Sequence, residues 1–433
     1  MFVGITNTPR DYAWGSTHAI ADLLGHAPSG GPEAELWLGA HAGSPSVIED
    51  AAEVGGFTDL AGWIAASPEV ALGASWATRP ADAAGSATAT PRLPFLLKIL
   101  AAGRPLSLQA HPTTEQARAG FALENEAGIA VDAGNRNYRD PFHKPELLFA
   151  LSDTFEALCG FRPLAEVRGI IAELRLLDLA TENPQAAAID LLEQRLAEGL
   201  RDTVDWLLRD GRGGDSGEVK WLVERVVALA EHAKFLAVGG ANIGYAGELA
   251  AVRVLAAEYP GDPGIVLALL LNRVSLKRGE VLYLPAGNIH AYLSGLGVEV
   301  MAASDNVLRG GLTPKHIDIE ELLAVLDFTR APSPRLAPIV VADGVARYRP
   351  GVSDFELVHI HADAAAPSPT PVPMRQITLT GPAIAICTVG GFLVAGSSSS
   401  RPLKRGQAVY VTPDEGTLTF AGTGEVFLAM PGA

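Results

Sequence analysis

The distribution of apolar residues divides the chain into three parts. From Met1 to about Phe161, short apolar runs are punctuated by glycine and proline, which is typical of strands joined by turns. Between Pro163 and Tyr259, alanine, leucine, glutamate and arginine dominate, and apolar residues recur at helical spacing. Strand-like patterning returns at Val274 and persists to the C-terminus. The pattern predicts a β-protein into which a helical block is inserted.

The helical block has four segments with this periodicity. We expect helices at Leu164–Leu177, Gln185–Leu208, Glu218–Phe235 and Gly247–Tyr259. Outside this block, the segment 77–91 is rich in alanine, threonine, proline and glycine, and its composition predicts a surface loop.

An internal repeat is present in the last third of the chain. The pattern Leu-Lys-Arg-Gly followed by a tyrosine occurs at 276–283 and again at 403–410. We therefore expect the C-terminal part to be a second barrel of the same kind as the first. The first copy continues to His290, whereas the second has no histidine after it, so we expect the second barrel to lack an active site.

Composition and charge narrow the class of protein. The 433 residues, 48% of them hydrophobic, suffice for two or three domains. A formal net charge of −16 disfavours nucleic acid or an anionic membrane as the main partner. Two cysteines favour a reducing compartment, and neither Met1–Trp14 nor any later apolar run has the character of a signal peptide or membrane span. We expect a cytoplasmic protein.

Two segments are expected to present histidines from strands. In the first, strand alternation sends Ser107, Gln109 and His111 to one face and the intervening apolar residues to the other. The second segment, 279–290, runs from a strand through a Pro-Ala-Gly turn to His290. Two histidine-bearing strands of this kind suit a small β-barrel that binds a metal.

The spacing of both segments resembles the two-part cupin signature, with glutamine in place of the first histidine. A neutral amide beside two imidazoles and one carboxylate leaves a divalent metal with residual positive charge, which favours Lewis-acid chemistry by zinc. The expected fold is thus mainly β, with two cupin (jelly-roll) barrels plus an inserted helical domain. The expected domains are a catalytic cupin barrel at 1–161 and 264–335, an inserted helical domain at 162–263 and a degenerate cupin barrel at 336–433.

The fourth ligand should be a carboxylate, and the residues alone leave two candidates. Glu115 has the general cupin spacing, but it follows Pro-Thr-Thr, which looks like a helix start, so a role as a first-turn charge is favoured. Glu146 shares a predicted strand face with Lys144, opposite Leu147 and Phe149.

A third cluster lies between Glu299 and Asp318. Arg309 and Lys315 bracket two glycines there, which indicates a loop held close to a ligand. Because the whole chain is acidic, basic groups at this place point to a bound anion such as phosphate.

Several motifs together resemble type I mannose-6-phosphate isomerase (phosphomannose isomerase), in the right order and over nearly the whole chain. They lie at 12–16, 34–41, 106–112, 143–146 and 299–315. The most specific are Ser-Leu-Gln-Ala-His-Pro, His-Lys-Pro-Glu and Ser-Asp-Asn-Val-Leu-Arg-Gly-Gly-Leu-Thr-Pro-Lys. The chain departs from the family pattern at Ala42, Val300 and Gly310, and none of these changes removes a charged or metal-binding group.

The resemblance implies a zinc enzyme that interconverts mannose 6-phosphate and fructose 6-phosphate through an enediol, with one Zn²⁺ per chain. The implied zinc ligands are Gln109, His111, Glu146 and His290. The implied catalytic residue is Arg309, and the implied substrate and phosphate contacts are Ser107, Lys315, Trp14 and Asp305. The proton-transfer base is left open between Lys144 and Glu299.

Two other functions fit parts of the pattern. A cupin metal dioxygenase would share the barrel, but Gln109 disfavours it. A sugar-binding or structural protein with two barrels would have no need for Lys144, Arg309 and Lys315 near a metal. We expect a monomer that acts on a small sugar phosphate.

Overall fold

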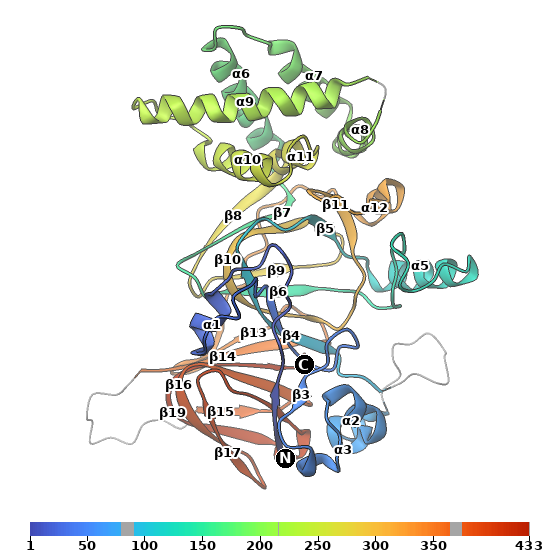
Figure 1. Ribbon diagram of the computed structural model, residues 1–433, viewed down its shortest axis with the longest axis vertical. Helices are drawn as coiled ribbons and strands as arrows, with labels where there is room; N and C mark the ends of the chain where they lie inside the picture. Colours follow the sequence, from blue (N-terminus) through green and yellow to red (C-terminus); the bar gives the residue numbers. More distant parts are fainter. Residues whose placement is uncertain (79–90, 215, 364–374, 433) are drawn as a thin grey trace.

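The computed structural model describes residues 1–78, 91–214, 216–363 and 375–432. About 32% of the chain is helical and 31% is in antiparallel strands, so the fold is mixed rather than mainly β. Most of the helical residues lie in the insert between Leu164 and Leu270, and a few shorter helices interrupt the N-terminal part of the chain. The expected surface loop at 77–91 falls largely outside the described residues. Figure 1 shows an elongated molecule with the helical insert at one end and two sheets below it.

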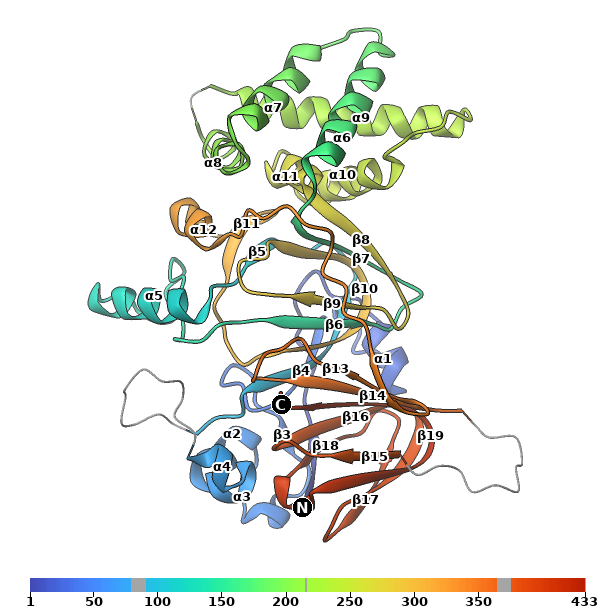
Figure 2. The same cartoon turned by 180° about the vertical axis from the view of Figure 1, so that it is seen from behind.

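The middle of the molecule is a sheet with nine strands among the described residues (Figures 1 and 2). Its strands are β2 (Glu35–Leu38), β4 (Phe95–Ala102), β5 (Leu108–Ala110), β6 (Glu146–Ala150), β7 (Thr154–Phe161), β8 (Leu271–Lys277), β9 (Val281–Leu284), β10 (His290–Ala302) and β11 (Leu308–Gly311). The main path runs β11-β5-β10-β4-β2. The long strand β10 also pairs with β6 and β7, so it brings residues from distant parts of the sequence together.

The second sheet has ten strands among the described residues. They are β1 (Phe2–Thr6), β3 (Val47–Ile48), β12 (Ile339–Ala342), β13 (Val345–Tyr348), β14 (Glu356–Ala362), β15 (Arg375–Thr378), β16 (Ala383–Ala395), β17 (Ser400–Lys404), β18 (Ala408–Val411) and β19 (Thr417–Met430). β1 pairs antiparallel with β18 and with β3. The first strand thus extends the C-terminal sheet. It is buried along most of its length, so it needs a strand on each side.

The inserted helices are α6 (Leu164–Leu179), α7 (Ala186–Glu198), α8 (Leu200–Gly211), α9 (Glu218–Val238), α10 (Ala246–Glu258) and α11 (Gly264–Leu270). Three of the four expected helices are found with starts at or next to the predicted residue. The expected helix 185–208 is instead two helices, because Gly199 has φ +153 and interrupts the helical backbone.

The remaining helices lie beside the sheets. They are α1 (Ala19–Leu24), α2 (Leu60–Ala66), α3 (Pro68–Leu72), α4 (Ala74–Ala77), α5 (Thr114–Glu126) and α12 (Ile319–Val325), with short 3-10 turns at Ala51–Val54 and Pro413–Glu415. Thr113 caps α5 in a capping box with Gln116, and Glu115 is an exposed charge in the first turn, as favoured above. Within the described residues, no helix combines the length and the apolar character needed to span a membrane.

One hydrophobic core joins the insert to the nine-stranded sheet. Every residue of α11 is buried, and Ile265 belongs to the same core cluster as Leu108 on β5, Leu308 on β11 and Leu312 just after β11. Each fully buried side chain of this kind contributes about 1.5–3 kcal/mol to folding. The insert is therefore packed firmly against the sheet edge formed by β5 and β11.

The sequence repeat corresponds to two equivalent hairpin turns, one in each sheet. Gly279 and Gly406 both have positive φ, at +88 and +84. The Lys277 amide donates to the Glu280 side chain at 2.8 Å, and the Lys404 amide donates to the Gln407 side chain at 2.9 Å. The same turn chemistry thus occurs in both halves, which accounts for the repeat.

Candidate active site

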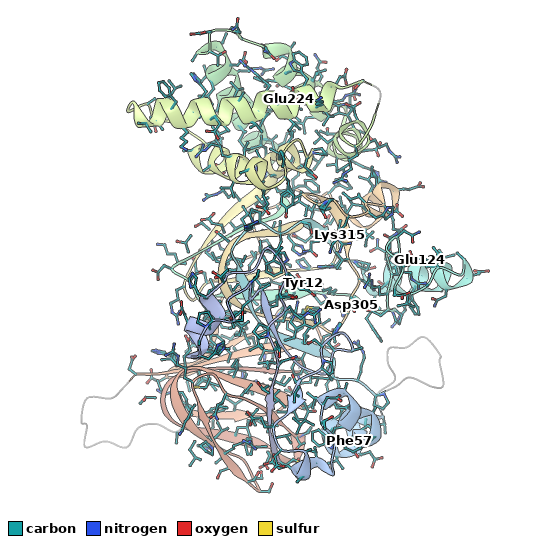
Figure 3. All side chains as sticks on the ribbon, viewed as in Figure 1. Tyr12, Phe57, Glu124, Glu224, Asp305 and Lys315 are labelled. Atoms are coloured by element: carbon teal, nitrogen blue, oxygen red, sulfur yellow. The ribbon has the colours of Figure 1, made fainter. Side chains whose placement is uncertain are left out.

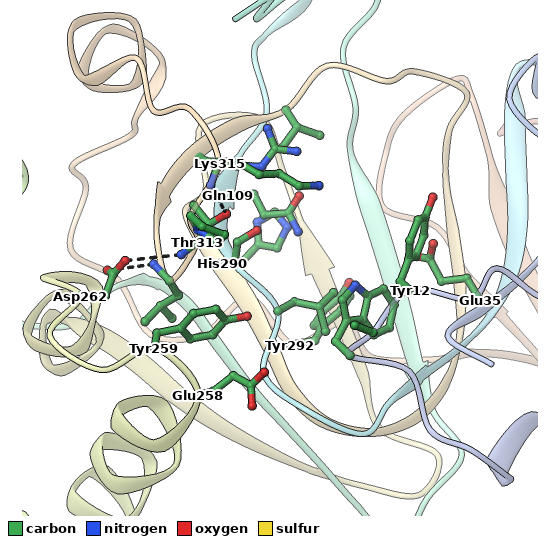
Figure 4. Close-up of a pocket in the computed structure, with 18 of the residues that line it drawn as sticks. Tyr12, Glu35, Gln109, Glu258, Tyr259, Asp262, His290, Tyr292, Thr313 and Lys315 are labelled. Carbon is green, nitrogen blue, oxygen red and sulfur yellow. Dashed lines mark hydrogen bonds between the residues drawn. The ribbon is translucent and has the colours of Figure 1, made fainter. Parts of the chain in front are cut away.

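A cavity of about 1060 Å³ opens between the nine-stranded sheet and the helical insert. Its walls come from the N-terminal loop around Tyr12, from strands β4, β5 and β10, from the end of α10 and the turn to Pro263, and from the loop 305–315. Figure 4 shows Gln109 and His290 on the sheet side, with Tyr259 and Asp262 facing them from the insert. In Figure 3, Tyr12, Asp305 and Lys315 lie in this middle layer, although they come from opposite ends of the first three quarters of the chain.

Three buried side chains form a group that could hold a metal ion. The ligand atoms of His111, Glu146 and His290 all lie within 4.8 Å of one another. The Nε2 atom of His111 is 3.3 Å from Glu146 Oε1, and the Nε2 atom of His290 is 3.2 Å from Glu146 Oε2. The carboxylate therefore lies between two imidazoles. Within the part of the chain that the structure describes, this is the group with ligand geometry.

The surroundings of both histidines direct Nε2 toward the centre of the group. His111 Nδ1 is 2.7 Å from the Asn306 carbonyl, and His290 Nδ1 is 3.0 Å from the Asn288 carbonyl. Such bonds fix the tautomer that leaves Nε2 free to bind a metal. The Nε2 atom of His111 is buried without a hydrogen-bond partner. Two imidazoles and a carboxylate with an orphaned nitrogen fit the donor set of zinc.

Electrostatics keep His111 and Glu146 in protonation states that suit metal binding. Burial, reinforced by the nearby Lys144 ammonium, lowers the pKa of His111 to about 4. Burial alone would raise the pKa of Glu146, but Lys144 and the two histidines outweigh it and hold that pKa well below its usual range. At neutral pH the site offers a neutral imidazole at His111 and a carboxylate at Glu146.

Gln109 lies directly beside this group. It is opposite His290 across β5 and β10, and opposite Arg309 across β5 and β11. Residues directly opposite on neighbouring strands project from the same face of the sheet. Gln109, His290 and Arg309 thus share one face that lines the cavity. Glu115 is exposed on α5 and is not in the metal group.

A buried ionic network lines the cavity, and the sequence analysis named Glu299 from it but missed Lys98, Glu35 and Tyr292. Lys98 on β4 has its Nζ 3.3 Å from Glu35 Oε1 and 3.0 Å from Glu299 Oε2. The hydroxyl of Tyr292 donates to Glu299 Oε1 at 2.9 Å. Burial alone would lower the pKa of Lys98, but Glu299 and Glu35 raise it, so the lysine stays charged. A lysine inside the apolar run of β4 was the one available sequence signal.

The two candidate bases have different partners. Lys144 Nζ is 3.1 Å from Glu146 Oε1, so its charge is directed at a candidate metal ligand. Glu299 is buried and lines the cavity. Burial raises the pKa of the Glu299 carboxyl, Lys98 opposes this effect, and the negative charges of Glu146 and Glu35 add to it. Glu299 therefore holds a proton more readily than an ordinary glutamate.

Three cations converge on the part of the cavity next to the loop 305–315. Arg139, Arg309 and Lys315 all line it. Burial lowers the pKa of Arg309 and of Lys315, and the neighbouring positive charges lower both further. Among the described residues, none of the three has an acidic ion-pair partner. Ser107 lines the same cavity. An anion with several acceptor oxygens would relieve this mutual repulsion.

The opposite wall of the cavity is aromatic. The rings of Tyr12 and Trp14 stack with their centroids 5.8 Å apart, and the Arg10 guanidinium lies over Tyr12. Asp305 lines the cavity with its carboxylate 3.2 Å from His41 Nε2. Burial alone would raise the pKa of Asp305, but His41 outweighs it and lowers that pKa. The Asp305 carboxylate can therefore accept hydrogen bonds, and it would not attract an anion.

Comparison with known proteins is consistent with this site. Residues 2–164 match the family model described as Phosphomannose isomerase type I, catalytic domain. Mannose-6-phosphate isomerase of Escherichia coli is 36% identical over 424 residues, which covers 98% of this chain and 97% of that protein. The Rattus norvegicus enzyme of the same name is 30% identical, covering 94% and 93%. A crystal structure of zinc-bound mannose 6-phosphate isomerase has a TM-score of 0.80, 34% identity and full coverage of both chains.

Proposed function

The chain belongs to the type I phosphomannose isomerase family, and on that premise we propose that it interconverts mannose 6-phosphate and fructose 6-phosphate by moving a proton between C1 and C2. The observation that carries the proposal is the position of the His111–Glu146–His290 group beside three cations without acidic partners. The side of the cavity next to the His111–Glu146–His290 group would hold the reacting carbons. The side next to the three cations would hold the phosphate.

The metal in this proposal is one zinc ion held by His111, Glu146, His290 and Gln109. The histidine and glutamate donors suit zinc, and Gln109 is supported by its position opposite His290. When bound, zinc supplies Lewis acidity that polarises the sugar oxygens at C1 and C2. Lys144 contributes by holding the Glu146 carboxylate at 3.1 Å.

Substrate orientation follows from the charges and rings of the cavity. Lys315 and Ser107 would contact the phosphate, with Arg139 adding positive charge nearby. Trp14 would cover a face of the sugar, and Asp305 would accept hydrogen bonds from its hydroxyl groups. Arg309, on the same sheet face as Gln109 and His290, would stabilise the negative charge of the enediolate.

For the proton transfer itself we favour Glu299. Its raised pKa suits a group that takes a proton from one carbon and returns it to the next. Tyr292 and Lys98 hold both of its oxygens, which fixes its orientation. Lys144 remains the rival base, and substitutions at the two positions separate them.

We further propose that both sheets are cupin (jelly-roll) barrels, and that the domains are 1–161 with 264–335, 162–263 and 336–433. The equivalent hairpins at Gly279 and Gly406 support two related barrels. In this division, α11 begins the returning part of the first unit although it packs with the helices of the insert, and β1 and β3 cross from the first unit to the sheet of the last.

The decisive experiment is a coupled assay of the zinc-loaded protein with mannose 6-phosphate, in which fructose 6-phosphate formation is followed. We expect turnover that is lost with a chelator and restored by zinc. Absence of turnover in fully zinc-loaded, folded protein would refute the proposal.

A further inference from the structure

The helical insert touches the loop that carries Lys315 through one acidic residue, Asp262. This side chain lies in the turn between α10 and α11 and is only 12% exposed. Its Oδ1 accepts the Leu312 amide at 2.9 Å, and its Oδ2 lies 3.4 Å from the Thr313 amide. Figure 4 shows these bonds crossing from the insert to the loop. An acid of the insert thus holds the backbone between Arg309 and Lys315.

The backbone held in this way is strained. Leu312 has φ +54, and among the described residues it is the one non-glycine residue with positive φ. A leucine in this conformation is unfavourable and persists when its surroundings enforce it. The enforcing contacts here are the burial of the Leu312 side chain in the core shared with α11 and the bond from its amide to Asp262.

The close approach of the two backbones depends on glycines. A Cβ on Gly264 would lie 3.0 Å from the Leu312 amide nitrogen, and one on Gly311 would lie 3.1 Å from Gly264 Cα. Gly311 also has φ +132, which side chains rarely tolerate. The insert and the loop are therefore built to be in direct contact at this point.

Arg212, at the C-terminal end of α8, completes the clamp. Its Nη2 donates to Asp262 Oδ2 at 3.0 Å and to the Thr313 carbonyl at 3.0 Å. Thr313 in turn accepts the Lys315 amide on its hydroxyl at 3.1 Å. A continuous chain of hydrogen bonds therefore runs from the insert to Lys315.

We propose that Asp262, together with Arg212, is a positioning residue through which the helical insert sets the affinity of the site for the substrate phosphate. The inference rests on the proposed role of Lys315 as a phosphate contact. Neither residue needs to touch the substrate, because each acts through the backbone at Leu312 and Thr313. The insert thereby has a function in binding as well as in packing.

A purely structural role for Asp262 is separable from this one. Its Oδ1 also accepts the Gly264 amide at 2.7 Å and so caps the start of α11. In Asp262→Asn, the remaining oxygen can still accept the Gly264 and Leu312 amides. The new amide group would instead face the Thr313 amide and Arg212, which are themselves donors. This variant therefore retains the cap and loses the link to Arg212 and Thr313.

The test compares Asp262→Asn with Asp210→Asn in the zinc-loaded full-length enzyme. Asp210 lies in the same insert and accepts the Val219 amide at 2.9 Å, so it is a matched control with no bond to the loop. We expect Asp262→Asn to raise KM for mannose 6-phosphate and the inhibition constant of inorganic phosphate by about tenfold, the equivalent of one lost charged hydrogen bond. We expect kcat to stay within about threefold of the wild-type value and the zinc content to be unchanged. Asp210→Asn should leave both constants as they are.

A double-variant cycle identifies the route of the effect. If Asp262 acts through Lys315, adding Asp262→Asn to Lys315→Ala should raise KM little beyond the value for Lys315→Ala alone. The inference would be overturned if the effects of the two substitutions on KM were fully additive, or if Asp262→Asn bound phosphate as tightly as the wild type.

Direct calorimetry with inorganic phosphate separates this inference from the proposed function. If the wild-type protein bound phosphate in a Lys315-dependent way but did not isomerise mannose 6-phosphate, the substrate assignment would fail, and weaker phosphate binding by Asp262→Asn would still support the positioning role. If the wild-type protein isomerised mannose 6-phosphate but did not bind inorganic phosphate, the proposed function would stand and the positioning role would be refuted.

Discussion

Gln109 on β5 lies directly opposite His290 on β10, although the whole helical insert separates them in sequence. The pairing places a neutral amide next to an imidazole whose other nitrogen is tied to the Asn288 carbonyl. On its other side, β5 pairs with β11, and Gln109 lies opposite Arg309 there. The short strand β5 therefore lies between the metal group and the cationic part of the cavity. The position of β5 in the sheet therefore fixes both halves of the site.

The first prediction concerns retention of the metal. His290→Ala removes one of the imidazoles beside Glu146, so the protein should lose its zinc on dialysis, as measured by elemental analysis. Activity should fall in parallel. The exposed His26 provides the matched control, and His26→Ala should keep one zinc per chain. Full zinc occupancy and full activity in His290→Ala would show that the ligand assignment is wrong.

A second prediction separates chemistry from binding at Arg309. Lysine keeps the charge but lacks the planar fork that matches a delocalised enediolate. Arg309→Lys should lower kcat by about 10²-fold or more, the typical effect of losing one stabiliser of transition-state charge, with KM nearly unchanged. Steady-state kinetics decide the matter. A change confined to KM would assign Arg309 to substrate binding instead.

Local sequence patterns were sufficient to predict the strand face that carries Ser107, Gln109 and His111. Leu106, Leu108 and Ala110 are buried and Ser107 and Gln109 are partly exposed, as this alternation predicts, whereas His111 is itself buried within the metal group. They also favoured a helix-start role for Glu115, which the structure confirms. These features depend on residues close in sequence, where periodicity and capping rules apply.

The parts that could not be predicted depend on contacts between distant segments. Lys98 meets Glu35 and Glu299 only because β2, β4 and β10 are neighbours in one sheet. Asp262 reaches Leu312 only because α11 packs on the edge of that sheet. No local pattern specifies such pairings, because they are set by how whole elements pack.

The third prediction tests the base. Glu299→Gln keeps the shape of the side chain but cannot take up a proton, so kcat should fall about 10²–10⁴-fold while zinc stays bound. Lys144→Met should be milder in kcat if Lys144 serves only to hold Glu146. If Glu299→Gln retained near-normal turnover and Lys144→Met abolished it, Lys144 would be the base.

The same residue sets an expected pH dependence. If Glu299 is the base, as proposed, its catalytic form is the carboxylate, and burial raises its pKa. As pH falls through this raised value, Glu299 takes up a proton and can no longer act as a base. The acid limb of kcat/KM should therefore lie above the usual glutamate pKa of about 4.3. A profile that is flat down to that pH would contradict the assignment.

A fourth prediction concerns stability between the two sheets. Glu425 on β19 accepts bonds from Arg278 at 3.0 Å and Thr388 at 2.9 Å, and lies 3.0 Å from His359 Nε2. Burial alone would raise the pKa of Glu425, but His359 and Arg278 outweigh it and lower that pKa. A lowered pKa gives stability that is present above about pH 4.3 and is lost as pH falls through the folded-state value.

Glu425→Gln should therefore cost about 1–3 kcal/mol of unfolding free energy at neutral pH, because a buried charged hydrogen-bond acceptor is lost. The variant should also show a weaker decline of Tm between about pH 5 and pH 3 than the wild type. Glu126→Gln, at an exposed position on α5, is the control and should behave like the wild type. An identical decline of Tm in Glu425→Gln and wild type would rule out this contribution.

The last prediction concerns the phosphate contact. Lys315 is a compact charge that lines the cavity beside Arg309 and Arg139. If it contacts the phosphate as proposed, its loss removes attraction for the phosphate in both the ground state and the transition state. Lys315→Ala should therefore raise KM for mannose 6-phosphate by about tenfold or more, with a much smaller effect on kcat, and should weaken inhibition by inorganic phosphate by the same factor. Lys277→Ala, on the β8–β9 hairpin, serves as a control for loss of one positive charge. If Lys315→Ala left the phosphate inhibition constant intact, the anion would have to be bound by Arg139 and Arg309 without it.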